Sequence, residues 1–396
     1  MIAPDRLGPH AMPERESNRR RPTNRELTRA VDALMTWYDR HARDLPWRRT
    51  RDPYAIWVSE VMLQQTQVRT VIPYWESWIR ELPNLAALAK AKEERVLKLW
   101  EGLGYYRRAR SLQAGARQIM KNHGGVFPAD FESILALPGV GRYTAGAIAS
   151  IAFGQAQPIL DGNIIRVFCR WGALPGDPRG AVLNRALWEQ ARVWVETAAG
   201  APPDRHPDPC ARLNQALMEL GATVCLPRAP ACGECPLADH CRALRTGRVA
   251  AYPESVQRAR TTARDFVVAV VVDSRNRDRV WLRRRLDEGV HGGLWEFPNL
   301  EIEPRSGDPA ERVARFPGMD LDFVDDWKPL ATVRHAVTRF RMTQHAFLGQ
   351  WKGRGRGVPG GGTWCGPDKL EALPMSSAHR RIARAWLRAR EKLHLG

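Results

Sequence analysis

The sequence has 396 residues, enough for two or three domains with separate hydrophobic cores. Its formal charge of +18 and its pI of about 10.2 indicate a polyanionic partner, either nucleic acid or an anionic membrane surface; an Arg-rich coding bias is the alternative source of the excess. The sequence has no run of 18 apolar residues and no apolar segment of a secretory signal at its N-terminus. Composition therefore excludes a membrane-spanning class, and we expect no secretion.

The first two thirds of the chain have a helical pattern. Residues 1–24 are rich in Pro, Arg, Glu and Asn, and we expect a disordered basic tail there. Asp52 and Pro53 form a typical helix start, followed by an apolar-rich segment from Tyr54 to Val71. We expect an all-α domain over 25–243, because no alternating pattern interrupts its helices. Further helices are predicted at 26–42, 93–100, 105–122, 129–136, 142–153, 163–171, 181–198 and 208–221.

A polar, basic stretch at 244–264 is predicted to be a linker, and the pattern changes after it. The β-branched run at 266–272 is typical of a buried strand. Residues 265–396 are therefore predicted to form a separate α+β domain. Its other predicted elements are strands at 280–282, 330–338 and 340–348, a Gly-rich loop at 353–362 and a basic helix at 377–393.

A Gly-rich turn opens a helix of small residues in the segment from Leu137 to Asn163. Gly139 and Gly141 allow backbone conformations closed to other residues, and residues 142–153 read as a helix. The free amides of such a turn and helix start can hold a phosphate group. The alternative is an ordinary helix–turn–helix corner.

Four cysteines lie within a short segment of the chain: Cys225, Cys232, Cys235 and Cys241. Their density suits one metal centre in a reducing compartment better than a disulfide framework. Four thiolates can bind zinc or a [4Fe–4S] cluster, and the chemistry alone leaves both open. The loop between the first two cysteines places Arg228 where it could meet a phosphate.

Two carboxylates are candidates for acid–base chemistry. Glu60 stands among Val, Met and Trp, and burial there would favour a protonated side chain that acts as a general acid; the alternative is a solvent-facing Glu on an amphipathic helix. Asp161, in an Asp-Gly-Asn loop, is expected to cap the next helix. One protonated and one ionised carboxylate are what cleavage of an N-glycosidic bond needs.

The turn LPGVGRYTAGA, the loop ILDGN and the four-cysteine spacing together resemble the helix-hairpin-helix glycosylase superfamily that contains endonuclease III. Within it, the chain is similar to the adenine DNA glycosylases of the MutY type through four segments over about 26–243. These are LPWR (45–48), SEVMLQQTQV (59–68), GLGYYRRAR (102–110) and NQALMELGATVC (214–225). The resemblance implies a two-lobed all-α domain with a [4Fe–4S] cluster on the four cysteines.

The resemblance also implies catalytic roles. Bifunctional lyases of the superfamily have a Lys after LPGVGR, and this chain has Tyr143, whose phenol cannot form a Schiff base. We therefore expect a glycosylase without strong β-lyase activity, with Tyr143 assisting the site. Matching of positions assigns Glu60 to protonation of adenine N7 and Asp161 to stabilisation of the oxocarbenium ion or a covalent intermediate, with Asn163 in support.

Further matched positions imply contacts with DNA. Gln65 and Tyr105 would enter the duplex where the adenine leaves, and Arg48 and Trp47 would line the adenine side. For Tyr105 and Trp47 the alternative is core packing. Gly139 and Gly141 of the hairpin would hold the backbone without reading sequence.

The segment at 280–301 resembles the Nudix-like C-terminal domain of MutY-type enzymes, which contacts 8-oxoguanine opposite the adenine. No Glu cluster for Mg²⁺ follows Pro298, so we expect a reader domain and not a hydrolase. Family members commonly have Phe-Ser-His at the oxidised base, whereas this chain has Val337-Thr338-Arg339; Thr338 keeps a hydroxyl. The alternative is that 333–340 is only an inner strand.

We therefore expect a monomeric, cytoplasmic bacterial enzyme associated with the nucleoid, which acts on double-stranded DNA containing A:8-oxoguanine or A:G mispairs. The linker offers no motif that would identify a repair or replication partner. Two alternatives remain. One is a bifunctional pyrimidine-damage glycosylase/lyase, and the other is a non-catalytic DNA-binding protein.

Overall fold

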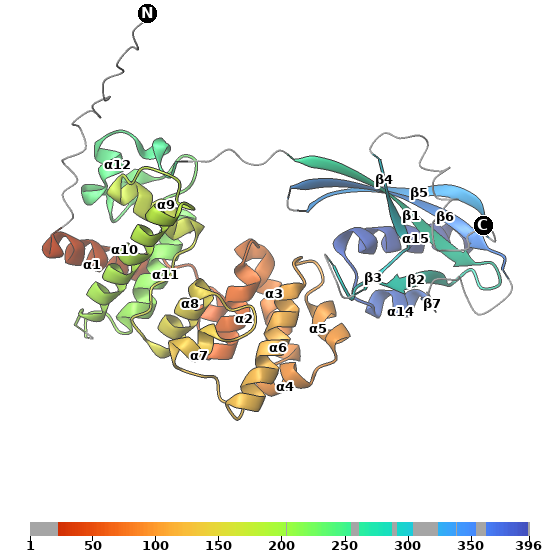
Figure 1. The fold of residues 1–396 in the computed structure, drawn as a ribbon, viewed down its shortest axis with the longest axis horizontal. Helices are drawn as coiled ribbons and strands as arrows, with labels where there is room; N and C mark the ends of the chain where they lie inside the picture. The colour runs from red at the N-terminus through yellow and green to blue at the C-terminus, as the bar shows by residue number, and fades with distance from the viewer. Residues whose placement is uncertain are drawn as a thin grey trace, which may run out of the picture. The chain divides into compact units, whose positions relative to one another are not determined.

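The computed structural model describes residues 23–202, 204–254, 261–286, 291–303, 324–337, 339–353 and 362–394. The chain divides into two compact units (Figure 1). The first comprises Met1–Arg43 and Gly154–Glu254, and the second comprises Asp44–Phe153 and Ser255–Gly396. Among the described helices, none is both long and apolar enough to cross a membrane.

The first unit is helical. Its longer helices are α1 (Asn24–His41), α9 (Gly162–Gly172), α10 (Ala181–Ala199) and α11 (Pro209–Thr223), and α11 packs against the other three. Thr23 and Glu26 form a capping box at the start of α1, which stabilises this first turn. The predicted tail is therefore two residues too long, and its remaining residues, 1–22, lie outside the described structure.

The predicted linker is wrong over 262–264, where a strand has already begun, and also over 244–254. This stretch holds the end of α12 (Arg242–Arg245) and a 3₁₀ turn, η4 (Val249–Ala251). Tyr252 is buried, and its carbonyl accepts a hydrogen bond of 3.0 Å from Nε of Arg170. These contacts make 244–254 part of the first unit although its composition is polar and basic. Residues 255–260 lie outside the described structure.

The helical part of the second unit departs from prediction in one segment. The run from Tyr54 to Val71 is broken, because α2 ends at Leu63 and Gln65 takes a left-handed backbone conformation with φ of 60°. A new helix, α3, then continues to Glu81, and the sequence reading missed most of it as well as α4. The elements here are η1 (Pro46–Arg48), α2 (Pro53–Leu63), α3 (Val68–Glu81), α4 (Leu85–Lys90), α5 (Glu93–Leu99), α6 (Arg107–Asn122), α7 (Phe131–Leu135) and α8 (Arg142–Phe153).

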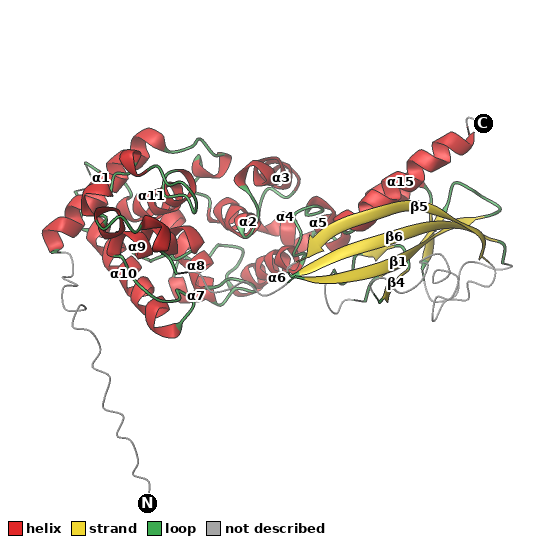
Figure 2. Cartoon of the chain, turned by 90° about the horizontal axis from the view of Figure 1, so that it is seen from above, coloured by secondary structure: helices red, strands yellow, loops and turns green. Residues whose placement is uncertain are grey.

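The C-terminal part of the second unit is a mixed sheet packed against helices, as predicted (Figure 2). The strands run in the order β3-β2-β1-β6-β5, with β4 also paired to β1 and β7 to β2. The central pair, β1 and β6, is parallel, whereas β5 and β6 form an antiparallel hairpin. The elements are β1 (Thr262–Asp273), β2 (Val280–Arg284), β3 (Trp295–Glu296), β4 (Asn299–Ile302), β5 (Val324–Val337), β6 (Phe340–Trp351), β7 (Thr363–Cys365), α14 (Pro367–Ala372) and α15 (Ser377–His394).

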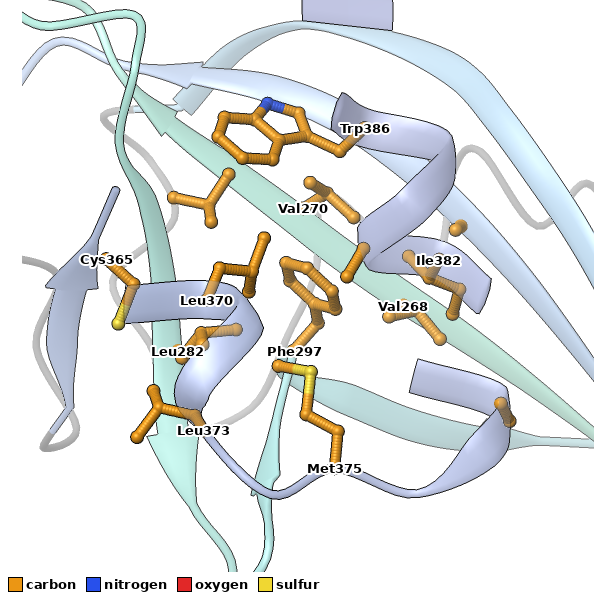
Figure 3. Packing of buried hydrophobic residues seen from close by; sticks show 14 of the residues in the cluster. Val268, Val270, Leu282, Phe297, Cys365, Leu370, Leu373, Met375, Ile382 and Trp386 are labelled. Carbon is orange, nitrogen blue, oxygen red and sulfur yellow. The ribbon is translucent and has the colours of Figure 1, made fainter. Parts of the chain in front are cut away.

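The predicted buried strand at 266–272 forms the C-terminal part of β1 and contributes to two cores. Val268 and Val270 pack in one cluster with Phe297 and Trp386 (Figure 3), and Val272 belongs to the same cluster. Val267, Ala269 and Val271 pack in the other, so the alternation of a strand explains why a continuous apolar run is needed. The Gly-rich loop predicted at 353–362 lies mostly outside the described residues.

The helical and mixed-sheet parts of this unit are joined by polar contacts. Nε of Arg380 in α15 donates to Oε1 of Glu101 at 2.5 Å, and both side chains are largely buried. The Tyr106 hydroxyl donates to the carbonyl oxygen of Met375 at 2.9 Å. These contacts attach the loop between α5 and α6 to the C-terminal part of the same unit.

Candidate functional site

Glu60 lies in a helix that is buried almost all round. Every residue of α2 from Tyr54 to Met62 is buried, and Glu60 itself is only 5% exposed. The alternative of a solvent-facing Glu on an amphipathic helix is therefore wrong. The reason is that α2 is apolar on both flanks of Glu60, so it has no polar face.

Tyr143 is a hydrogen-bond partner of this carboxylate. The Tyr143 hydroxyl donates to Oε2 of Glu60 at 3.0 Å, and the two residues are 83 positions apart in sequence. The phenol comes from the first turn of α8, and α8 packs directly on α2. A hydroxyl can also accept a hydrogen bond, so this pair can be satisfied with Glu60 either ionised or protonated.

The turn before α8 needs a glycine at one of its two predicted positions. Gly139 has φ of 74°, and a Cβ there would lie 2.5 Å from Cβ of Ser111 in α6. Gly141 has no such conformation, and a Cβ on it would meet nothing within 4 Å. The expectation of a restricted conformation is thus correct for Gly139 and wrong for Gly141, which instead leaves open space beside the helix start.

In the first unit, Asp161 caps α9. Its Oδ1 accepts a hydrogen bond from the backbone N–H of Ile164 at 2.8 Å, so the predicted capping role is confirmed. Its Oδ2 accepts from Nδ2 of Asn163 at 3.2 Å. Burial raises the pKa of Asp161, while the amide donors of Ile164 and Asn163 oppose that rise by stabilising the charged form.

Arg166 was not among the predicted site residues, although it organises this loop. Its Nη2 donates to Oδ1 of Asn163 at 2.9 Å and to the carbonyl of Gly221 at 2.6 Å. Its Nε donates to the carbonyl of Cys225 at 2.7 Å. A Cβ on Gly221 would lie 2.6 Å from Cβ of Asn163, so a glycine is needed where α11 passes the loop. An Arg in a chain with so many Arg residues gave no signal for this role.

The predicted DNA-contacting residues of the second unit differ in exposure. Tyr105 is 48% exposed and has φ of 48°. The predicted helix over 105–122 began at Tyr105, and this start is wrong because α6 begins at Arg107. Gln65 lies in the turn between α2 and α3. Trp47 is buried and makes an edge contact with Trp75, as expected if this residue serves core packing. Arg48 beside it is partly exposed.

The remaining predicted contacts lie in loops. Arg228 is exposed in the loop between Cys225 and Cys232. Thr338 lies outside the described residues, and its neighbours Val337 and Arg339 stand at the end of β5 and in the turn to β6. The segment at 333–340 is therefore the end of a hairpin and not only an inner strand. Arg339 is exposed and lies over the Phe340 ring at 5.2 Å.

The four cysteines follow α11 and form no disulfide bond. Burial raises the pKa of the Cys235 thiol to about 12, and the nearby Cys225, Cys241 and Cys232 raise it further, so the four groups interact. Among the described residues, no group of three or more His, Cys, Asp or Glu is arranged to hold a metal ion. The donor set, four mutually interacting thiols in one loop, fits a cluster that takes only Cys ligands.

Arg170 supports this loop with a buried cationic side chain. Its Nη1 donates to the carbonyl of Leu226 at 2.6 Å and lies 3.4 Å from Sγ of Cys225. Arg170 therefore fixes the backbone that directly follows Cys225.

Comparison with known families agrees with this geometry. A model described as "HhH-GPD superfamily base excision DNA repair protein" matches residues 58–192, and one described as "NUDIX domain" matches 267–385. A third, "Iron-sulfur binding domain of endonuclease III", matches 225–241. The fold and these matches define a base excision DNA repair protein of the HhH-GPD superfamily with a C-terminal Nudix-like domain. The chain therefore has an iron–sulfur cluster, of the [4Fe–4S] type usual in these families, and the matched segment 225–241 contains the four cysteines.

Individual proteins narrow the class. The adenine DNA glycosylase of Homo sapiens is 36% identical over 91% of this chain and 74% of its own length, and that of Rattus norvegicus is 36% identical over 89% and 77%. The adenine DNA glycosylase of Buchnera aphidicola (strain APS) is 33% identical over 68% and 73%. A solved thermostable thymine-DNA glycosylase is 30% identical, with a TM-score of 0.49, over 56% of this chain and 98% of its own. The chain belongs to the adenine DNA glycosylase family.

Proposed function

We propose that this chain removes adenine paired with 8-oxoguanine, and with guanine, from double-stranded DNA. It acts as a monofunctional base excision repair glycosylase. The observation that carries the proposal is the buried Glu60 paired with Tyr143, at the position where lyases of the superfamily have a Lys. A phenol cannot form a Schiff base with the sugar, so the reaction ends at the abasic site.

The proposed reaction begins with protonation of the base. Glu60, in its protonated form, gives a proton to N7 of the extruded adenine, which makes the base a better leaving group. The buried apolar helix around Glu60 disfavours a bare carboxylate, and the Tyr143 hydroxyl can rotate to accept from the acid or to donate to the carboxylate.

Asp161 is proposed to stabilise the positive charge that develops on the sugar, either as a neighbouring carboxylate or through a covalent intermediate. Its two oxygens accept hydrogen bonds from the Ile164 amide and from Asn163, and such donors favour the ionised form that this role needs. Arg166 keeps the Asn163 side-chain oxygen occupied, so that the Asn163 amide nitrogen faces Asp161.

The DNA backbone is proposed to meet the amides of the hairpin around Gly139 and Gly141. The open space beside Gly141 and the amides at the start of α8 suit a phosphate oxygen. The net charge of the chain adds attraction that is independent of sequence, to which the exposed Arg228 and the partly exposed Arg48 would contribute.

Gln65 and Tyr105 are proposed to enter the duplex when the adenine leaves it. Flipping a base costs a few kcal/mol because stacking and pairing are lost, and an inserted side chain offsets part of that cost. Tyr105 carries an exposed aromatic ring in a fixed left-handed conformation, which suits a wedge. The buried Trp47 is assigned to packing behind the adenine side.

The base opposite the adenine is proposed to be read by the Nudix-like domain at the hairpin between β5 and β6. The support is the exposed Arg339 on the Phe340 ring and the hydroxyl of Thr338. The segment Val337-Thr338-Arg339 departs from the Phe-Ser-His that is common in the family. Substitution Thr338→Ala is expected to lower the preference for A:8-oxoguanine over A:G. Equal loss on both duplexes would contradict a reading role.

The experiment that tests the proposal is an excision assay on four duplexes, with A:8-oxoguanine, A:G, A:C and thymine glycol as central sites. We expect adenine release that is fastest opposite 8-oxoguanine, and no covalent adduct after borohydride treatment. Release of thymine glycol with a trapped adduct would favour the bifunctional alternative, and binding without turnover on every duplex would favour a non-catalytic protein. Gel filtration with and without DNA would test the proposed monomer.

Localisation is also part of the proposal. The polycationic chain and its DNA substrate suit a cytoplasmic enzyme that associates with the nucleoid. Fluorescence microscopy of a tagged chain in a bacterial host should show signal over the DNA, and signal at the envelope would contradict it.

A further inference from the structure

Two loops of the second unit carry the side chains that are proposed to enter DNA. The Gln65 loop (residues 64–67) follows α2, and the Tyr105 loop (residues 101–106) precedes α6. Gln65 and Tyr105 both have a left-handed backbone, with φ of 60° and 48°. Non-glycine residues keep this conformation only where the surroundings fix it.

One side chain reaches both loops. Nη1 of Arg108, in the first turn of α6, donates to the carbonyls of Val61 at 2.7 Å and Gln64 at 2.6 Å, and lies 3.3 Å from that of Met62. Its Nη2 donates to the carbonyls of Leu103 at 3.1 Å and Gly104 at 3.3 Å. The same guanidinium therefore holds the C-terminal end of the helix that carries Glu60 and the backbone directly before Tyr105.

Stacking adds to these hydrogen bonds. The Arg108 guanidinium carbon lies 5.6 Å from the Tyr105 ring centroid and 5.3 Å from that of Trp100. Its Nε is buried without a hydrogen-bond partner. Burial lowers the pKa of Arg108 to about 10, so the group keeps its charge near neutral pH. A planar cation with several donors can bridge two loops in this way, and an ammonium cannot reproduce the fork.

We propose that Arg108 is a positioning residue that sets Gln65 and Tyr105 as one rigid pair, so that both side chains enter the duplex in a single step of adenine extrusion. The inference rests on the proposed function, because it concerns the same reaction. The role assigned to Arg108 differs from those of the two carboxylates, because the hydrogen bonds that it donates go to backbone carbonyls.

The test uses the full-length chain and the variant Arg108→Lys. Base extrusion is followed by the fluorescence of 2-aminopurine opposite 8-oxoguanine, and excision by single-turnover rates on A:8-oxoguanine. We expect Arg108→Lys to lower the fluorescence rise and to slow excision by about 10²-fold, as a misplaced group does. Its pH–rate profile should keep the wild-type shape, because both carboxylates are unchanged.

Arg117→Lys is the matched control. Arg117 belongs to the same helix and also donates to a backbone carbonyl, that of Ala89 at 3.0 Å, but it contacts neither loop. This variant should extrude and excise as the wild type does. An equal loss of extrusion and excision in Arg108→Lys and Arg117→Lys would show that only the stability of α6 matters, and would overturn the proposal.

A double-mutant cycle decides whether Arg108 acts through the two loops. In a chain that carries Gln65→Ala and Tyr105→Ala, the change Arg108→Lys should cause little further loss, because the positioned side chains are already absent. Additive losses would overturn the proposal. A wild type that extrudes 2-aminopurine but excises no adenine would reject the proposed function, while the fluorescence cycle would still test Arg108.

Discussion

The two candidate catalytic carboxylates, one in each unit, are held in different ways: Glu60 is buried, and Asp161 is partly buried. Glu60 lies inside an apolar helix and meets a phenol, whereas Asp161 caps a helix and meets amide donors on both oxygens. Amide donors favour a charged carboxylate, while a hydroxyl accommodates either form. Under the proposed roles, the hydrogen-bond partners of the two carboxylates, and not burial alone, would separate the acid from the charge stabiliser.

The largest effect is expected from Glu60→Gln. The amide keeps the size of the side chain and can still accept from Tyr143, but it has no proton to give. Excision of adenine should fall by about 10²–10⁴-fold, which is the usual contribution of a general acid. Affinity for the A:8-oxoguanine duplex, measured by fluorescence anisotropy, should stay near wild type. A near-normal excision rate would remove Glu60 from its assigned role.

The next effect is expected from Asp161→Asn. Asn caps helices as well as Asp does, so α9 should keep its start, but the negative charge is lost. We expect single-turnover excision to fall by about 10²–10³-fold, as for the loss of one electrostatic stabiliser.

Asp130→Asn is the control for Asp161→Asn. Asp130 caps α7 by accepting from the Ser133 N–H at 2.8 Å, but it lies at the surface. Its change should leave the excision rate as it is. If Asp161→Asn behaves in the same way, Asp161 is only a cap.

A smaller effect is expected from Tyr143→Phe. This change leaves Glu60 buried without its phenol partner, and the loss of such a hydrogen bond costs about 1–3 kcal/mol. We expect excision to slow by about tenfold, which corresponds to the lower part of that range. Single-turnover rates would measure it, and borohydride trapping should stay negative. An unchanged rate would show that the hydroxyl is dispensable.

The smallest effect concerns stability. Burial raises the pKa of Asp161, so its ionisation opposes folding once the pH exceeds the ordinary carboxyl range near about 4. The free energy of unfolding of Asp161→Asn, relative to wild type, should therefore improve as the pH rises from about 4 to about 7 in urea titrations.

Asp130 should show the opposite sign. Its hydrogen bond from the Ser133 amide lowers its pKa, so ionised Asp130 favours folding, and Asp130→Asn should lose stability relative to wild type as the pH rises from about 2 to about 4. The same sign for both variants would contradict the assigned environments.

The sequence allowed much of this account to be predicted where signals were local. The Asp161 cap follows from Asp before a helix, whereas the apolar neighbours of Glu60 allowed its burial but left a solvent-facing position open. The relation between Glu60 and Tyr143 joins positions 83 residues apart and required the fold. The break at Gln65 was missed because nothing in its residue type demands a left-handed backbone.

The two organising arginines could not be found in advance. Arg108 and Arg166 act chiefly on backbone carbonyls, which leave no trace in the sequence, and they stand among many solvent-facing arginines. The two hairpin glycines looked alike, but the close approach of Ser111 distinguishes Gly139 from Gly141.

The most direct measurement of the central claim is one single-turnover reaction on an A:8-oxoguanine duplex, sampled for free adenine and for strand scission before and after alkali. We predict that adenine is released and that the strand is cut only after alkali, as a monofunctional glycosylase requires. A strand that stays intact after alkali would contradict the account.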